Sequence, residues 1–240
     1  MKGGDVVWMA ALAAVAGVLL VSVSRAALME ATRTHPYLTG FGKFAVLATF
    51  GELLGLRIRV GEWRRPVGMP WRVLVWGALG VGLVLVFQVF SAGVSSAIGR
   101  GLLPSGSGMI GTFAVAFWIS AVMNVTFAPT MMVAHRMTDA YIELTGGRMF
   151  AGGVGFGDVI AHIDWQTFFG FVVAVTIPFF WIPAHTITFL LPPEYRVLMA
   201  AFLSIALGTI LALPHEPKTA PKHRETITTA QESTLVLSGK

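Results

Sequence analysis

The stretch RVLVWGALGVGLVLVFQVFSAGVSSA, residues Arg72–Ala97, has apolar residues on every side of any helix that it forms. A helix needs about 20 residues to cross about 30 Å of hydrocarbon, because each residue advances it by about 1.5 Å. A surface helix of a water-soluble domain carries a polar face, and this stretch has none. The stretch therefore predicts a membrane-spanning helix.

Similar runs lie on both sides of it in the sequence. They are Val6–Ser24, Leu38–Leu56, Ile110–Ala134, Gln166–Leu190 and Tyr195–Leu213. Only 12% of the residues are charged, and the mean hydropathy is +0.74. We therefore predict an all-α fold, a polytopic helical membrane bundle of about six transmembrane helices. Residues 1–213 would form a single transmembrane domain, and residues 214–240 a mobile polar cytoplasmic tail.

The basic residues divide unequally between the two sides of such a bundle. With the N-terminus in the cytoplasm, the cytoplasmic side receives Lys2, Arg57, Arg59, Arg64, Arg65, Arg72, Arg136, Arg148, Lys218, Lys222, Arg224 and Lys240. The opposite side keeps Arg25, Arg33, Arg100 and Arg196, with Lys43 at a helix end. Because Lys and Arg concentrate in cytoplasmic loops, we expect both termini in the cytoplasm. We interpret the first run as a retained signal anchor, since it is long for a signal peptide.

Composition and motifs argue against several classes of protein. The chain has no Cys, which excludes disulfides, thiolate metal sites and thiol nucleophiles. Its net charge of +5 follows the sidedness of the loops, so we expect the lipid bilayer, and no nucleic acid, as a partner. The glycine-rich stretch 146–157 follows no strand and lacks the ending of a phosphate loop. Without a nucleophile–base arrangement or a redox motif, we expect no enzyme, no cofactor and no metal site.

Glu52 is the first candidate for function among the polar residues of the apolar runs. An unpaired polar group in lipid costs several kcal/mol, so such residues tend to face a cavity or a partner. Glu52 lies about one helical turn from the end of its run. There it either pairs with Arg57 or Arg59 at the interface or lines a pore.

Three further candidates lie deeper in their runs. Gln88 and Asn124 either form hydrogen bonds between helices or face a water-filled path. His185 follows two prolines, which free backbone carbonyls, and it either caps this broken helix or takes part in conduction or gating. Together with Glu52, these residues are the candidates for a pore lining or gate.

His135, Asp139 and Glu143 follow one another at a spacing of four residues, which places them on one face of a helix. Such a column could hold a divalent metal ion, and an intramembrane enzyme would then be an option. A straight helix usually offers only two ligands to one ion, and Arg136 lies beside the column. We therefore expect a solvated extension of the preceding helix.

The stretch WIPAHTITFLLPPEYR, Trp181–Arg196, resembles the signature of the twenty-two-kilodalton peroxisomal membrane protein family, also called Mpv-seventeen-like. The stretches His35–Glu52 and Asn124–Pro129 are similar to two earlier elements of that family, in the same order. The residues that carry the resemblance as structural motif positions are Pro129, Trp181, Pro183, Pro192 and Arg196. Met123 and Thr188 depart from it, because the family has Asp and Asn at these positions.

The resemblance implies a small helical membrane protein with pore-forming activity and an undefined solute. We therefore expect a channel-like pathway for a small solute or an ion. The alternative is a non-conducting scaffold or accessory subunit, with a homo-oligomer or other membrane subunits as partners. We expect a bacterial cytoplasmic (inner) membrane, because the chain shows no Arg- and Ser-rich transit segment.

Overall fold

The computed structural model describes residues 3–150 and 152–212 of the chain, and all regular elements in these residues are helical. The predicted tail, residues 214–240, lies outside the described residues. The elements in chain order are α1 (Gly3–Leu20), α2 (Ser22–Thr34), α3 (Pro36–Val60), α4 (Met69–Gly99), α5 (Gly108–Thr126), α6 (Ala128–Leu144), α7 (Phe156–His162), α8 (Trp165–Thr167), the π-helical turns η1 (Phe168–Val173) and η2 (Ile177–Trp181), α9 (Ile182–Leu190) and α10 (Pro193–Ala212).

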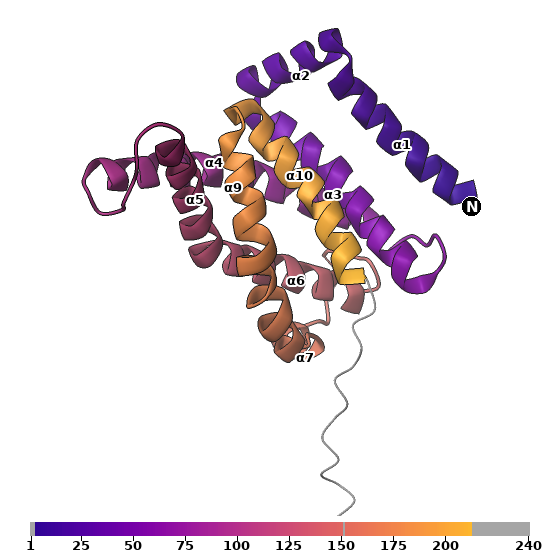
Figure 1. Ribbon diagram of the computed structural model, residues 1–240. Coiled ribbons are helices and arrows are strands. Elements are labelled where there is room, and N and C mark those ends of the chain that lie inside the picture. The colour runs from indigo at the N-terminus through magenta and orange to yellow at the C-terminus, as the bar shows by residue number, and fades with distance from the viewer. Residues whose placement is uncertain (1–2, 151, 213–240) are drawn as a thin grey trace, which may run out of the picture.

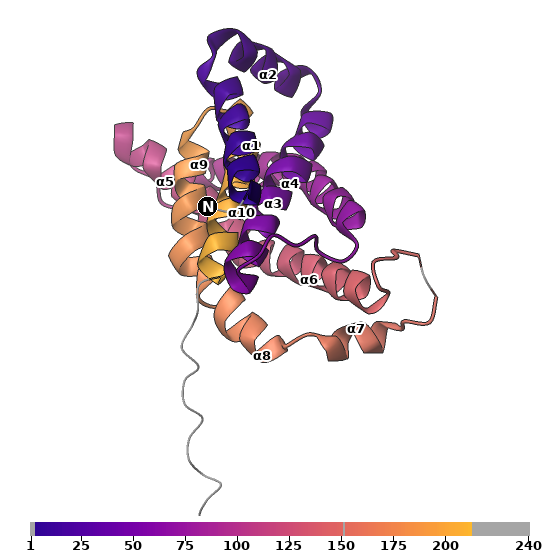
Figure 2. The same cartoon turned by 90° about the vertical axis from the view of Figure 1, so that its right-hand side faces the viewer.

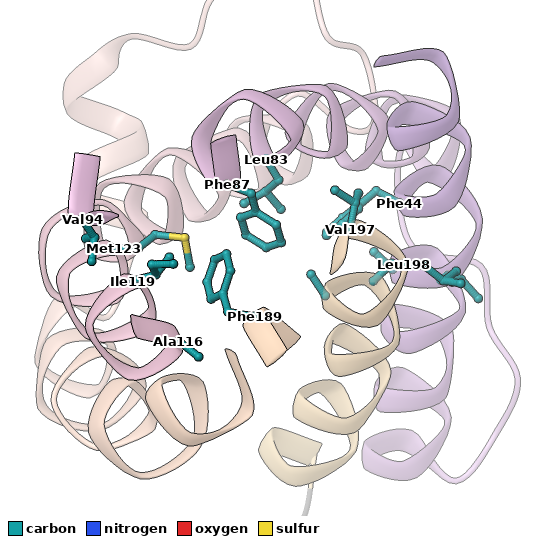
Figure 3. Packing of buried hydrophobic residues seen from close by; sticks show 14 residues of the cluster. Phe44, Leu83, Phe87, Val94, Ala116, Ile119, Met123, Phe189, Val197 and Leu198 are labelled. Atoms are coloured by element: carbon teal, nitrogen blue, oxygen red, sulfur yellow. The ribbon is translucent and has the colours of Figure 1, made fainter. Parts of the chain in front are cut away.

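Five long elements form a closed ring. Helix α3 packs on α4 and on α10, α9 packs on α10 and on α5, and α5 packs back on α4. Helices α1 and α2 lie outside this ring, and α6 to α8 lie across one end of it (Figure 1, Figure 2). The buried core fills the ring where α3, α4, α5, α9 and α10 face one another (Figure 3).

Five described segments are long and apolar enough to cross a membrane. They are α1, α4, α5, the segment Trp165–Leu190 and α10 up to Ile210. The predicted run Leu38–Leu56 lies in α3, which is not among them and carries Lys43 and Glu52. The count of about six spans and the cytoplasmic termini therefore stay predictions.

Two predicted boundaries are wrong. The run Ile110–Ala134 is not one helix, because α5 ends at Thr126 and Pro129 begins α6. A proline in the first turn of a helix has no amide hydrogen to lose there, and it favours a new helix at that point. The first run, Val6–Ser24, is not one helix either, because α1 ends at Leu20 and α2 begins at Ser22.

Glycines permit a close contact between α3 and α10. A Cβ atom on Gly208 would lie 2.8 Å from the carbonyl oxygen of Gly51, and one on Gly51 would lie 2.9 Å from the Cα of Ile205. These neighbours are backbone atoms, which cannot rotate away. The α3–α10 contact therefore requires small residues at both positions.

The segment before α9 is distorted where the prolines predict it. Pro178 lies in η2 and Pro183 lies in the first turn of α9. Proline removes a helical hydrogen bond and clashes with the preceding turn, so the local ladder widens into π-helical turns. This distortion turns Trp181 and His185 toward the interior, where both are buried.

Candidate functional site

A cavity of about 390 Å³ lies inside the ring, and we name it cavity A. One end is lined by Arg59, which is exposed, and by Arg136, which is half-buried. The other end is lined by Asn124 and His185, which are both buried. Glu52 lines it between these ends, so the structure brings three of the four candidate residues to one cavity. Its apolar walls come from α3, α4, α5, α6, α10 and the segment before α9.

Arg72 holds three carboxylates together near the open end of cavity A. Its Nη1 lies 2.7 Å from Glu52 Oε1 and 2.9 Å from Asp139 Oδ1, and its Nη2 lies 2.9 Å from Glu143 Oε1. Nε donates to the backbone carbonyl of Val67 at 3.0 Å. The side chain of Arg72 is only 7% exposed. We call these four charged side chains the Arg72 cluster; it ties α3, α4 and α6 to one another.

The cluster corrects two interpretations from the sequence. Glu52 pairs with Arg72, not with Arg57 or Arg59, and Arg57 instead pairs with Asp5 of α1 at 3.1 Å. The face of α6 that we expected in solvent packs against Arg72. Asp139 on that face is a carboxylate whose side chain is 13% exposed. The sequence contains a signal for this cluster, because Arg72 is a charged residue at the start of an apolar run. In the sequence analysis Arg72 contributes only to the predicted orientation.

Two aromatic side chains extend the cluster. Trp76 Nε1 donates to the second oxygen of Glu52 at 3.1 Å, and the Trp76 ring contacts His135 in a tilted arrangement, with centroids 4.1 Å apart. His135 Nδ1 lies 3.6 Å from Asp139 Oδ2. Glu52 thus uses both oxygens in interactions with α4. Its geometry supports the ion-pair interpretation and leaves the carboxylate on the cavity wall.

Burial shifts the pKa of two groups in α6 in opposite directions. It raises the pKa of Asp139 to about 6, against the opposing effect of Arg72, because a charged carboxylate is poorly solvated there. It lowers the pKa of His135 to about 4, because a charged imidazole is also poorly solvated there. At neutral pH the histidine is therefore uncharged. Among the described residues, no group of His, Asp and Glu side chains is arranged to hold a metal ion.

The buried end of cavity A is a hydrogen-bonded pair between α5 and α9. Asn124 and His185 are 1% and 6% exposed. His185 Nδ1 lies 3.1 Å from Nδ2 and 3.2 Å from Oδ1 of Asn124. Asn124 Nδ2 also donates to the Ser120 carbonyl at 2.9 Å. The carbonyl of Ile182, in the first turn of α9, accepts hydrogen bonds from the hydroxyls of Ser120 and Thr186.

Gln88 lies elsewhere, on the wall of a second cavity of about 380 Å³ that we name cavity B. Cavity B is lined by the beginnings of α3 and α10 and by the last turns of α2, whereas cavity A is lined by the later parts of α3 and α10. The two cavities thus enter the ring from opposite ends. Lys43, 8% exposed, lines cavity B and donates to Thr32 Oγ1 at 2.7 Å.

Side chains that line the two cavities touch one another, and we call Phe87, Phe189 and His185 the shared layer. His185 lines cavity A and Phe87 lines cavity B, and their rings touch with centroids 5.7 Å apart. Phe189 lies against Phe87 at 5.1 Å, and Figure 3 shows these two rings facing each other in the middle of the ring of helices. Phe44 and Val197 belong to the same buried cluster.

The motif residues are structural in their described contacts. Pro129 and Pro183 lie in the first turns of α6 and α9, and Pro192 immediately precedes α10. Trp181 lines cavity A and stacks on His185 with centroids 5.1 Å apart. Arg196 donates to the carbonyls of Leu191 and Phe189, at the end of α9. These contacts order the connection between α9 and α10.

No family model matches this chain, and no curated protein or solved structure matches it either, so the family resemblance rests on the motifs alone.

Proposed function

We propose that this chain is a non-enzymatic integral membrane protein that forms a gated pathway for a small solute or an ion. The observation that carries the proposal is the pair of cavities that enter the ring from opposite ends and stop at one shared layer. All four candidate residues line one or the other cavity: Glu52, Asn124 and His185 line cavity A, and Gln88 lines cavity B.

The shared layer would act as the gate. Phe87 and Phe189 are each 4% exposed, and they meet between the two cavities. An apolar constriction excludes water and with it any hydrated solute, and a small displacement of its side chains lets water enter. The described conformation thus corresponds to a closed state of the proposed pathway.

The arrangement of charge supports an orientation. The end of α3, where Arg57 and Arg59 lie, is at the same end of the ring as cavity A, and Arg136 in the middle of α6 lines that cavity. Under the positive-inside rule, cavity A would open to the cytoplasm. We also propose the bacterial cytoplasmic membrane as the location and, from the motifs in the sequence, membership of the Mpv-seventeen-like family.

Solute efflux from sealed liposomes tests the proposal. Wild-type protein, Phe87→Ala and Phe179→Ala would be reconstituted at equal density, and the release of entrapped dyes of graded size would be followed. Phe87→Ala removes the ring between the cavities and should increase efflux severalfold. Phe179→Ala is the matched control, because this phenyl group is 80% exposed and lines neither cavity.

Tight liposomes with correctly inserted wild-type and Phe87→Ala protein would contradict the pathway. They would favour the second candidate, a scaffold or accessory subunit. That candidate has one observation of its own: α1 has no buried residue, and Val6, Val7 and Leu20 are more than half exposed. A stoichiometric subunit that copurifies with the full chain, and is lost when residues 214–240 are deleted, would establish it.

A further inference from the structure

Cavity B gathers more positive than negative charge. Arg33, Lys43 and Arg196 line it, together with one carboxylate, Glu194. Glu194 is already bound to Arg33, with Nη2 and Oε1 2.6 Å apart. Within residues 3–150 and 152–212, neither Lys43 nor Arg196 has a carboxylate at ion-pair distance. Glu194 acts on Arg196 only from beyond ion-pair distance, so the three cations of this cavity share one carboxylate.

A buried charge without a counter-ion is costly. Lys43 is 8% exposed, and its described hydrogen-bond partner is the neutral hydroxyl of Thr32. Arg196 donates to two backbone carbonyls and, at 3.5 Å, to the hydroxyl of Ser91, and it lies over the ring of Phe189, 5.4 Å from its centroid. Neutral acceptors solvate a cation only in part, and the uncompensated part costs several kcal/mol in a low-dielectric surrounding. An anion in cavity B would remove that cost.

The backbone adds to the positive potential. The first residues of α3 and of α10 both line cavity B, among them Tyr37 and Glu194. The beginning of a helix carries a partial positive charge and free amide groups, which favours anions. Gln88 supplies a neutral amide donor on the same wall. The volume of about 380 Å³ leaves room for a tetrahedral oxyanion and part of the molecule attached to it.

We infer that cavity B binds a phosphate group, carried by a lipid headgroup or by a soluble phosphate compound. An excess of two positive charges over the Arg33–Glu194 pair matches the charge of a phosphate dianion, and Lys and Arg are the side chains that bind phosphate best. The site does not require that the pathway conducts, because it depends only on residues of α2, α3, α4 and α10.

Binding measurements on the full chain in phosphatidylcholine nanodiscs test this site. Inorganic phosphate would be titrated calorimetrically at constant ionic strength, and retention of phosphatidic acid would be measured by native mass spectrometry. Wild-type protein should bind at least one of the two. Lys43→Gln should weaken that binding at least tenfold. Arg25→Gln, an exposed arginine of α2 that does not line the cavity, should change it less than twofold.

A second variant guards against misfolding of Lys43→Gln. Gln88 is exposed on the cavity wall, so Gln88→Glu should fold, supply a counter-charge, raise the melting temperature of the ligand-free protein and abolish phosphate binding. Binding of phosphatidic acid alone would identify a lipid source, and binding of inorganic phosphate a soluble one. Absence of both in the wild type, or unchanged binding in Gln88→Glu, would overturn the site. Efflux plays no part in these measurements, so failure here and failure of the pathway are separable.

Discussion

The imidazole of His185 on α9 meets the phenyl ring of Phe87 on α4 edge to face, with an interplanar angle of 79°. One side of this contact borders cavity A and the other borders cavity B. His185 is in turn held by Asn124 of α5. The shared layer thus depends on this polar pair, and a displacement of either partner would reach the aromatic contact.

Replacement of Asn124 by Leu should lower the free energy of unfolding by about 1–3 kcal/mol, because His185 Nδ1 would be buried without a partner. The double variant Asn124→Leu/His185→Leu should recover part of that loss, since neither polar group then remains. Equilibrium unfolding of the wild type, both single variants and the double variant completes the cycle. Strictly additive losses would show that the two side chains do not interact.

Arg72→Met should destabilise the protein by about 3–5 kcal/mol, because Glu52 and Asp139, whose side chains are 17% and 13% exposed, would lose the cation that they share. Arg72→Lys should recover little, since an ammonium group cannot replace the planar fork that reaches three partners. The matched control is Arg64→Gln, whose ion pair with Glu62 is largely exposed. It should cost less than about 1 kcal/mol. Similar losses for Arg64→Gln and Arg72→Met would refute the role of the cluster.

Asp139 should make stability depend on pH. A carboxyl with an ordinary pKa of 3.8 that titrates at about 6 in the folded protein contributes stability below about pH 4, and this contribution is lost as the pH rises through about 6. His135, whose pKa falls from 6.5 to about 4, acts oppositely: its contribution is present above pH 6.5 and is lost as the pH falls through about 4. Arg72, Arg136 and Glu143 face Asp139 and set its environment.

Asp139→Asn isolates the carboxyl from the histidine. As the pH rises from 5 to 7, the free energy of unfolding of the variant should increase by about 1 kcal/mol relative to that of the wild type. The reason is that the variant lacks the carboxyl whose ionisation opposes folding. Unfolding curves at both pH values measure this difference. Glu62→Gln, at a side chain that is 56% exposed, serves as the control and should show no such gain. An Asp139→Asn difference that is equal at both pH values would contradict the pH dependence.

Gly208→Ala should destabilise the α3–α10 contact by about 1–3 kcal/mol, because the new methyl group would lie 2.8 Å from the carbonyl oxygen of Gly51. Gly93→Ala is the control of identical chemistry. A Cβ at Gly93 meets nothing within 4 Å, and alanine should stabilise α4 there by about 0.5–1 kcal/mol. Melting temperatures that shift in opposite directions would bear this out, and a stabilising Gly208→Ala would refute it.

The sequence by itself determined the helical fold class, the apolar segments and the interruption before α9. These features depend on the local chain, because hydropathy, helix periodicity and proline act over one or two turns. The same reasoning selected Glu52, Gln88, Asn124 and His185, since a polar residue within an apolar run is visible without knowledge of its neighbours. It assigned Glu52 to arginines close to it in the sequence, and this was wrong.

Only the tertiary structure decided which helix faces meet. Arg72 reaches Glu143 across 71 positions of the chain, and Asn124 reaches His185 across 61. Helices that are apolar on every side carry no sequence signal for the face that turns inward, so partners at this separation depend on the packing of the whole ring. The close contacts of glycines and the bulk of the phenyl rings set that packing. They place Gln88 in a different cavity from the other three candidates.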